Sequence, residues 1–517
     1  MKILIVKLSA IGDVVHCLPL AAEIKARLPQ AKITWLVEPP AKALLENNKA
    51  VDQVIVFNKK DLLGRLRGPE TLGTGLGDIK TLLTKLSAEH FDLAIDAQGL
   101  LKSALLAFAS KAPIRVGFRG AREGSSLLMS NTLDVGDYYS LSRHVVDLNI
   151  DLANFALEIL AQKKNLVLLA KPERAVFPLP EPEALVRQSI QLLLAAEDRG
   201  TPGAAAASSA QPSLVPGRIL ADEAPPKAPF SSGKAPSILP EAPSEAPLPG
   251  TSRALTQGQG AIPGVGSPLI PLERIDCPVA VLVPGTTWVT KIWPADHWSD
   301  LGAALLQAGA GRLIICGGKS DEGLNRTIYI GIKERLARLA TDPIQPTVNS
   351  GGAPENSSDI GSVGVAGSQN SSDIGSVGVA GSQNSSDIGS VGVAGSQNSS
   401  DIGSVSGGRL LDLTAKTDLI QLVALFQISD LVVGADTGPV HLAAATGRPL
   451  VVAVHGASPW TRNGPYGEKG RAVYKGIACQ PCFSKTCAIK TIECLRELAA
   501  ARVMESIVQS LKPVQDN

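Results

Sequence analysis

Short apolar runs alternate with longer amphipathic segments in the first part of the chain, residues 1–175. The runs have the length of buried strands and lie at Ile3–Leu8, Ile33–Val37, Val54–Phe57, Leu93–Ala97 and Ile114–Phe118. Segments with helical periodicity lie between or after them, as at Ala21–Leu28, Ile79–Leu86 and His144–Leu160. Because alternating strands and helices are typical of a parallel sheet covered by helices, this pattern predicts an α/β domain.

The same alternation resumes near Pro278 and predicts a second α/β domain over residues 278–495. Its strand-like runs are Val279–Val283, Leu313–Cys316, Leu431–Gly434 and Leu450–Val454. Its helical segments include His297–Gln307 and Asp418–Ile428. A last helix is expected within residues 496–512, at Ala499–Leu511.

Two low-complexity segments interrupt this pattern. Residues 201–271 are dominated by Ala, Pro, Ser and Gly, a composition that predicts a flexible linker. Residues 343–408 contain a 14-residue repeat that starts at Asn356, Asn370 and Asn384, with a shortened copy from Asn398. Each full unit offers only one Ile and two Val as large apolar residues. We therefore favour a disordered insertion, while a short β-solenoid stays open as the alternative.

Composition narrows the classes of partner and compartment. Aromatic residues make up 4% of the 517 residues and the net charge is +1 without a basic run, so nucleic acid is not expected as a partner. Lys7 and Asp13 interrupt the first apolar run, which indicates a buried strand rather than a signal peptide. No apolar stretch is long enough to cross a bilayer. Three isolated cysteines in apolar segments favour a reducing, cytoplasmic compartment: Cys17, Cys277 and Cys316.

The segment Asp436-Thr-Gly-Pro-Val-His441 carries the strongest chemical indication. It follows an apolar strand and opens a helix, and Pro439 suits a first helical position. The free N–H groups of a first helical turn, together with the helix dipole, favour an anion such as phosphate. In the alternative interpretation Asp436 is only the helix cap and His441 an ordinary first-turn residue.

Two further loops at predicted strand ends suit a nucleotide. Pro284-Gly-Thr-Thr287 offers the hydroxyls of Thr286 and Thr287, and Lys291 adds an ammonium that suits a diphosphate. Asp321 and Glu322 follow a Gly-Gly pair and could accept hydrogen bonds from ribose hydroxyls. Each loop alone could be an ordinary polar turn, but three in one domain favour a binding site.

Asp13 follows the first predicted strand through Ser9-Ala-Ile-Gly12. Ligand sites of α/β folds lie at the carboxyl ends of strands, where a carboxylate can act as a general base on a hydroxyl. The simpler interpretation of Asp13 is a helix N-cap.

Four cysteines lie close together near the C-terminal end, in the pattern Cys479-x2-Cys482-x4-Cys487-x6-Cys494. Four thiolates can hold a tetrahedral zinc ion. Structural zinc sites usually contain two short-spaced pairs, and this pattern contains one. Packed or redox-sensitive thiols are the preferred interpretation, with zinc as the alternative.

Several ordered motifs resemble the ADP-heptose:lipopolysaccharide heptosyltransferases, glycosyltransferase family nine. The resemblance covers residues 1–175 and 278–512 and rests on five stretches: Lys7-Leu-Ser-Ala-Ile-Gly-Asp-Val-Val-His16, Ile95-Asp-Ala-Gln-Gly-Leu-Leu-Lys-Ser103, Val116-Gly-Phe118 with Ala121-Arg-Glu123, Pro284-Gly-Thr-Thr287 through Lys291-Ile-Trp-Pro294, and Gly434-Ala-Asp-Thr-Gly-Pro-Val-His-Leu442.

This resemblance implies a GT-B fold, with two Rossmann-like domains facing across a cleft. The N-terminal domain would bind the acceptor and the C-terminal domain the nucleotide sugar, and the helix in 496–512 would pack back on the N-terminal domain. The site residues implied are Asp13 as catalytic base, Thr286, Thr287, Lys291, Thr437, Gly438 and His441 at the diphosphate, Asp436 beside the sugar or leaving phosphate, Asp321 or Glu322 at the ribose, and Lys102 and Arg122 at an anionic acceptor.

The activity implied is inverting transfer of heptose from ADP-heptose to the inner core of lipopolysaccharide or a related lipid-linked glycan. The resemblance places the enzyme in the cytoplasm with peripheral contact to the inner membrane, and no cofactor is required. A transferase for another nucleotide sugar, a non-catalytic nucleotide-sugar-binding scaffold, and a thiol or zinc protein remain the alternatives.

Overall fold

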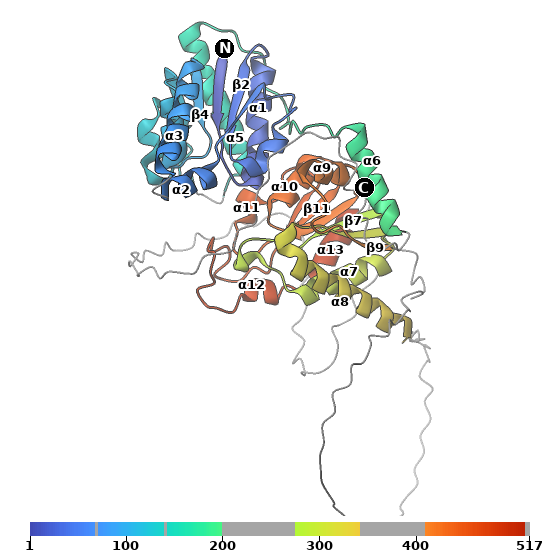
Figure 1. Ribbon diagram of the computed structural model, residues 1–517. Coiled ribbons are helices and arrows are strands. Elements are labelled where there is room, and N and C mark those ends of the chain that lie inside the picture. The colour runs from blue at the N-terminus through green and yellow to red at the C-terminus, as the bar shows by residue number, and fades with distance from the viewer. Residues whose placement is uncertain (68–70, 139–141, 199–274, 342–408, 512–517) are drawn as a thin grey trace, which may run out of the picture.

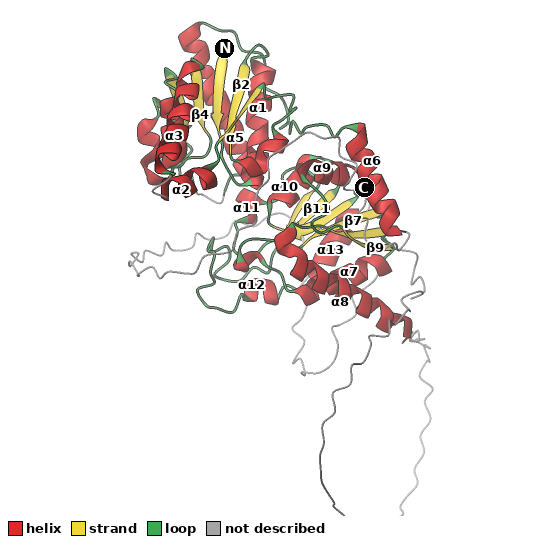
Figure 2. Cartoon of the chain, viewed as in Figure 1, coloured by secondary structure: helices red, strands yellow, loops and turns green. Residues whose placement is uncertain are grey.

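The computed structural model describes residues 1–67, 71–138, 142–198, 275–341 and 409–511 (Figure 1). The predicted linker at 201–271 and the predicted repeat insertion at 343–408 lie outside the described residues. The described residues form two α/β domains, each built around a parallel sheet (Figure 2).

The N-terminal sheet has the strand order β3-β2-β1-β4-β5-β6, and all its neighbours are parallel. Its strands are β1 (Lys2–Val6), β2 (Lys32–Val37), β3 (Gln53–Val56), β4 (Leu93–Asp96), β5 (Ile114–Phe118) and β6 (Asn131–Leu133). Its helices are α1 (Ile11–Arg27), η1 (Pro39–Leu44), α2 (Lys59–Arg67), α3 (Leu72–Ala88), α4 (Leu101–Ala109), η2 (Arg122–Leu128) and α5 (Val145–Lys164).

Alternate residues of β1 point into two different apolar layers, as the period of a strand requires. Ile3 and Ile5 pack into the layer formed with α1 and α5. Leu4 and Val6 pack into the opposite layer, which includes Leu86 of α3 and residues of α4. Because both faces of this strand are buried, its sequence is a continuous run of apolar residues and does not alternate with polar ones.

The C-terminal sheet has the order β12-β11-β10-β7-β8-β9 and is also parallel. Its strands are β7 (Val279–Val283), β8 (Arg312–Ile315), β9 (Arg409–Asp412), β10 (Leu431–Ala435), β11 (Leu450–Val454) and β12 (Gly470–Val473). Its helices are η4 (Val289–Lys291), α7 (Ala295–Gln307), η5 (Lys319–Asp321), α8 (Glu322–Thr341), α9 (Leu419–Ile428), α10 (Gly438–Ala445), α11 (Trp460–Asn463), α12 (Glu493–Arg496) and α13 (Ala500–Leu511).

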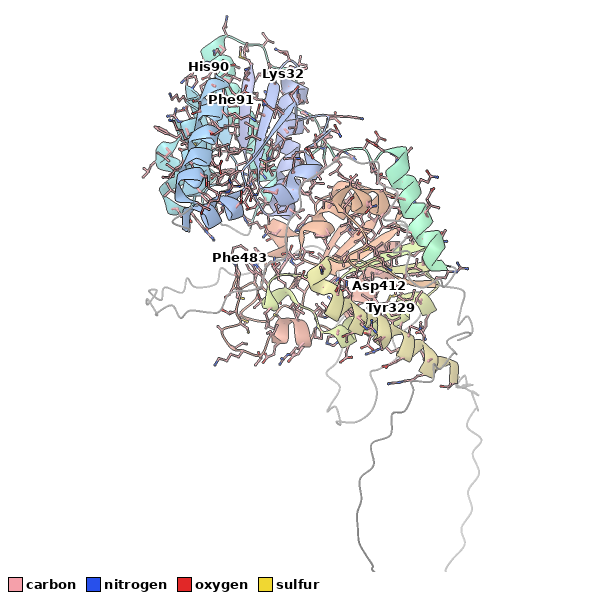
Figure 3. All side chains as sticks on the ribbon, in the orientation of Figure 1. Lys32, His90, Phe91, Tyr329, Asp412 and Phe483 are labelled. Atoms are coloured by element: carbon pink, nitrogen blue, oxygen red, sulfur yellow. The ribbon has the colours of Figure 1, made fainter. Side chains whose placement is uncertain are left out.

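Counted from the first strand of each domain, the two sheets have the same order, 3-2-1-4-5-6. In such doubly wound sheets the strand order reverses beside the first strand, and ligands bind outside the carboxyl ends at that point. Lys32, His90 and Phe91, which stand at or just before the amino ends of strands, lie at the end of the first domain remote from the second (Figure 3). The carboxyl ends of the first sheet therefore face the second domain.

The predicted packing of the last helix on the N-terminal domain is wrong. Val503, Met504 and Ile507 of α13 lie in the core of the C-terminal domain, where α13 packs on α7 and β11. The segment that crosses between the domains is α6 (Ala184–Asp198), which follows the first domain and packs on α9 and β9 (Figure 1). The apolar face of α13 is therefore already covered by its own sheet.

Candidate active site

Helices α1 and α10 meet with their N-terminal ends against each other, one from each domain. A Cβ atom on Gly12 would lie 2.8 Å from Cδ2 of His441 and 3.3 Å from Cα of Gly438. The two backbones therefore approach as closely as two glycines allow. Both helix dipoles present their positive ends at this junction, which favours an anion bound beside it.

Asp436 is the centre of a buried polar network behind the start of α10. Its Oδ2 accepts a hydrogen bond from Nζ of Lys291 at 2.7 Å, and its Oδ1 lies 3.0 Å from Nε2 of His441. Only 3% of the Asp436 surface is exposed. Burial alone would raise the pKa of Asp436, but the hydrogen bond from His441 and the nearby Lys291 ammonium hold it well below its usual range.

Lys291 is held at the surface of this network. Its Nζ also donates to the backbone oxygen of Asp436 at 3.2 Å, and it lies 4.9 Å from the ring centre of Trp288. The side chain keeps 15% of its surface exposed, so the ammonium can still meet a ligand. Asp436 is therefore a positioning partner of Lys291 and does not cap the helix, since Thr437 occupies the N-cap position.

Asp13 has a different environment. It lies in the first turn of α1, its Oδ2 accepts a hydrogen bond from Ala10 N–H at 3.0 Å, and its side chain is exposed. Lys7 lies behind it, buried, with Nζ donating to the backbone oxygen of Ala97 at 3.0 Å. Burial lowers the pKa of Lys7, but the nearby acidic groups, of which Asp13 has the largest effect, together outweigh it, so the pKa of Lys7 is raised. Ala10, and not Asp13, occupies the N-cap position of α1, so the predicted N-cap role of Asp13 is wrong. Asp13 stands at the third helical position, and its general-base role stays a prediction.

A cluster of histidines at the domain junction was missed in the sequence. His16 of α1 lies one turn beyond Asp13 and packs against His441, with ring centres 4.2 Å apart. His144 packs edge-on to His16 at 5.5 Å, and its Nε2 lies 3.0 Å from the backbone oxygen of Gly464 in the other domain. Burial, reinforced by His441 and His144, holds the pKa of His16 well below its usual value, so His16 is neutral. The spacing of His16 from Asp13 was the available indication in the sequence.

The two threonines predicted at the diphosphate lie on the loop after β7. Thr286 is half-buried and its Oγ1 accepts a hydrogen bond from Trp288 N–H at 3.4 Å, while Thr287 is exposed. Thr437 lies on the loop after β10, the strand that pairs with β7, and donates from Oγ1 to the backbone oxygen of Ala435 at 3.2 Å. These loops follow the adjacent strands β7 and β10, so the fold brings them together.

The two acidic residues predicted at a ribose lie on the loop after β8 and at the start of α8. Asp321 accepts hydrogen bonds from Gly318 N–H at 2.8 Å and from Ser320 Oγ at 3.2 Å, so its carboxylate caps its own turn. Glu322 begins α8 and is exposed. Their role at a ribose stays a prediction.

The two cations predicted at an acceptor lie on the N-terminal domain. Lys102 of α4 is 3.2 Å from Oε1 of Glu38, just beyond β2, and is half-buried. Arg122 begins η2, which packs beside α4. Both lie on elements of the domain that carries Asp13, and their contact with an acceptor stays a prediction.

The four clustered cysteines line one small cavity together with Thr290, Ile477 and Ile492. All four are free thiols. Backbone N–H groups of residues 489–492 face Cys487 and lower its pKa, whereas burial and the other three thiols raise the pKa of Cys494 to about 11. Within the described residues, no three His, Cys, Asp or Glu side chains are arranged to hold a metal ion. The zinc alternative stays a prediction.

Two parallel-sheet domains that meet at the carboxyl ends of their strands define the GT-B class of glycosyltransferase-like folds. The chain matches the model of glycosyltransferase family 9 (heptosyltransferase) over residues 79–182, 245–341 and 403–493, more than half of its length. The chain belongs to glycosyltransferase family 9.

Curated relatives match over a shorter length. The chain is 36% identical over 106 residues to lipopolysaccharide heptosyltransferase 1 of Escherichia coli K12, which is 20% of this chain and 32% of that protein. It is 31% identical over 105 residues to lipooligosaccharide heptosyltransferase 2 of Campylobacter jejuni, which is 20% of this chain and 33% of that protein. The matched part therefore spans about a third of each relative.

Solved structures agree with the fold over nearly the whole chain. E. coli ADP-heptose lps heptosyltransferase II superposes with a TM-score of 0.54 at 16% identity, covering 99% of this chain and 98% of that one. The structure of E. coli heptosyltransferase WaaC with ADP superposes with a TM-score of 0.51 at 17% identity, covering 99% of this chain and 100% of that one. These comparisons confirm the predicted GT-B architecture.

Proposed function

We propose that this protein is an inverting glycosyltransferase that transfers heptose from ADP-heptose to the inner core of lipopolysaccharide or a related lipid-linked glycan. The observation that carries the proposal is the junction of α1 and α10. There an exposed carboxylate at Asp13 of one domain adjoins the Lys291–Asp436–His441 network of the other. The two relatives compared above are a lipopolysaccharide and a lipooligosaccharide heptosyltransferase, which supports the choice of donor and acceptor.

Asp13 acts as the general base in this proposal. An acceptor hydroxyl gives its proton to the Asp13 carboxylate while its oxygen attacks the anomeric carbon of the donor. The bond between that carbon and the diphosphate oxygen breaks, and ADP leaves from the opposite face. The anomeric configuration therefore inverts. The exposed position of Asp13 leaves it open to an incoming hydroxyl.

The C-terminal domain holds the leaving diphosphate. Negative charge grows on the diphosphate as the glycosidic bond breaks, and in this proposal the Lys291 ammonium and the start of α10 stabilise it. The pairing of Lys291 with Asp436 and the start of α10 at Gly438 support this role. Asp436 fixes the ammonium, so little reorganisation is needed during the reaction. We further propose that Thr286, Thr287, Thr437, Gly438 and His441 line the diphosphate site, that Asp321 or Glu322 faces the ribose, and that transfer requires no bound metal.

The acceptor approaches from the N-terminal domain, where Lys102 and Arg122 would meet its anionic groups. We propose peripheral contact with the cytoplasmic face of the inner membrane. Among the described residues, no helix combines the length and apolar character needed to cross a membrane.

A direct test incubates the purified protein with ADP-heptose and a delipidated inner-core oligosaccharide lacking heptose. Mass spectrometry should show addition of one heptose, and NMR should show the inverted anomeric configuration. Thermal shifts with a panel of nucleotide sugars should be largest for ADP-heptose. Strong ADP-heptose binding without transfer to any acceptor would instead favour the non-catalytic alternative, and a larger shift with another sugar nucleotide would change the donor.

A further inference from the structure

Helix α4 exposes a stripe of large apolar side chains on the N-terminal domain. Leu101, Leu105 and Phe108 are 42%, 51% and 51% exposed. Their spacing of four and three residues places them on one face of the helix. The opposite face, with Leu106 and Ala107, is buried in the domain core. The outward stripe is therefore not needed to hold α4 on its sheet.

Elements beside α4 extend this apolar surface. Leu127 of η2 is 87% exposed, and η2 packs against α4 and is tied to it by a hydrogen bond from Leu101 N–H to Oε2 of Glu123 at 3.1 Å. On the other neighbour, α3, Leu76 and Leu83 are also exposed. We call the six apolar residues on these three elements the α4 surface: Leu76, Leu83, Leu101, Leu105, Phe108 and Leu127.

Cations without carboxylate partners accompany the α4 surface. Arg115 lies 5.2 Å from the ring centre of Phe108 and donates to the backbone oxygens of Leu128 and Ala112, so its charge is not neutralised by these contacts. Lys111, just after α4, and Lys80 of α3 are exposed and form no ion pair with any described residue. Apolar side chains interspersed with exposed cations are typical of surfaces that lie on anionic bilayers.

We propose that the α4 surface docks the protein on an anionic lipid bilayer and presents the acceptor-binding side of the N-terminal domain to the membrane. The inference rests on the proposed function for the acceptor, because Lys102 of the same helix is a predicted acceptor residue. Leu105 and Phe108 insert among the lipid chains, and Lys80, Lys111 and Arg115 meet the phosphate groups. The charge pattern favours an anionic lipid surface over a second copy of this nearly neutral chain.

The test is co-sedimentation of the full chain with vesicles of phosphatidylcholine alone or with added phosphatidylglycerol. The wild-type protein should bind the anionic vesicles, and binding should weaken as salt is added. Leu105→Glu with Phe108→Glu should lower the partition coefficient by about tenfold or more, because two inserted side chains are lost and two charges oppose the lipid. Leu192→Glu on α6, also 57% exposed, is the matched control and should bind like the wild type.

Several outcomes would overturn the inference. They are no binding of the wild type to anionic vesicles, equal binding by the double Glu variant, or equal loss in the Leu192→Glu control. The milder Leu105→Ser with Phe108→Ser variant, with unchanged thermal unfolding, excludes misfolding as the cause of a loss. A homodimer in solution that the double Glu variant dissociates would assign the surface to a second copy.

Activity measurements separate this inference from the proposed function. The ratio of transfer onto a vesicle-embedded acceptor to transfer onto a soluble oligosaccharide should fall in the double Glu variant. If the wild type binds vesicles through the α4 surface yet transfers no heptose to either acceptor, the proposed function fails and the docking surface stands. If transfer occurs but the ratio does not change, the docking surface fails alone.

Discussion

The two domains share one strand order but prepare their functional groups in opposite ways. In the C-terminal domain, Asp436 is buried and already paired with Lys291 and His441. In the N-terminal domain, Asp13 is exposed and bonded to the backbone of its own turn. A group that must stabilise charge benefits from being fixed in advance, whereas a group that must accept a proton has to remain open to its substrate. In the proposed function, the C-terminal domain therefore stabilises charge and the N-terminal domain takes up the proton.

Removal of the proposed proton acceptor, Asp13, tests this difference between the domains with the largest expected effect. Asp13→Ala and Asp13→Asn should each lower the transfer rate by about 10³-fold or more, because neither side chain can take the proton of the acceptor hydroxyl. Steady-state kinetics with ADP-heptose measures this. Asp61→Asn, an exposed acid on α2 that pairs with Arg65, is the control and should transfer normally. Normal turnover by Asp13→Ala would remove the proposed base.

The second prediction concerns the fixed cation of the C-terminal domain. Lys291→Met should lower the transfer rate by about 10²–10³-fold, because the charge on the leaving diphosphate loses its main partner. Asp436→Asn should have a smaller effect, since the ammonium remains but is less well held. Isothermal titration with ADP measures the binding part of each loss. An Asp436→Asn loss larger than that of Lys291→Met would mean that Asp436 itself contacts the reacting groups.

The third prediction tests whether the close approach of α1 and α10 matters. Gly12→Ala adds a Cβ 2.8 Å from Cδ2 of His441, so either the His441 ring or the junction of the domains must shift. Because small misplacements between reacting groups are costly, transfer should fall by about tenfold to a hundredfold. Gly64→Ala on α2 meets open space and serves as the matched control. Equal activity of both variants would show that the junction need not be this close.

The fourth prediction uses the buried histidine beside this network. Burial lowers the pKa of His455 from 6.5 to about 4. Between pH 6.5 and about 4, the native protein therefore binds fewer protons than the unfolded chain. The stabilisation that is present above pH 6.5 is lost as the pH falls toward 4. Between pH 6.5 and 5 the contribution of His455 amounts to about 2 kcal/mol. The free energies of unfolding of the wild type and of His455→Asn, measured with urea, should converge as the pH falls. Free energies that change in parallel with pH would contradict this prediction.

The strands were predictable because most are buried on both faces. Val279–Val283 and Leu450–Val454 were predicted with the bounds that the structure has. Of the four edge strands in the described sheets, β3 was predicted and β6, β9 and β12 were missed. β12 has the sequence Gly-Arg-Ala-Val, β9 is Arg-Leu-Leu-Asp, and β6 has only three residues. Short polar edges carry no periodic apolar pattern that could separate them from loops.

The candidate site was predictable in its residue types but not in its pairings. The loops after β7 and β10 were identified from their chemistry, yet the pair between Lys291 and Asp436 joins residues 145 positions apart. Asp321 was predicted at a ribose, and its carboxylate bonds to its own turn. The position of α13 was predicted by analogy, and its apolar side chains instead pack on the C-terminal core.

The smallest expected effect concerns the cysteine cavity. Cys482→Ser should leave the transfer rate unchanged, because neither Lys291 nor Asp436 lines the cavity that contains Cys482. Elemental analysis of wild type and variant under reducing conditions decides between packed thiols and the zinc alternative. One zinc per chain in the wild type, lost in Cys482→Ser, would establish the zinc site.

The division of labour between the two domains can be measured in one pair of experiments on Asp13→Ala and Lys291→Met. ADP-heptose affinity is determined by titration, and the chemical step by single-turnover transfer. We expect Asp13→Ala to bind the donor like the wild type while its chemical step is lost, and Lys291→Met to lose donor affinity as well. Normal single-turnover transfer by Asp13→Ala, or a loss of donor affinity equal to that of Lys291→Met, would contradict the account.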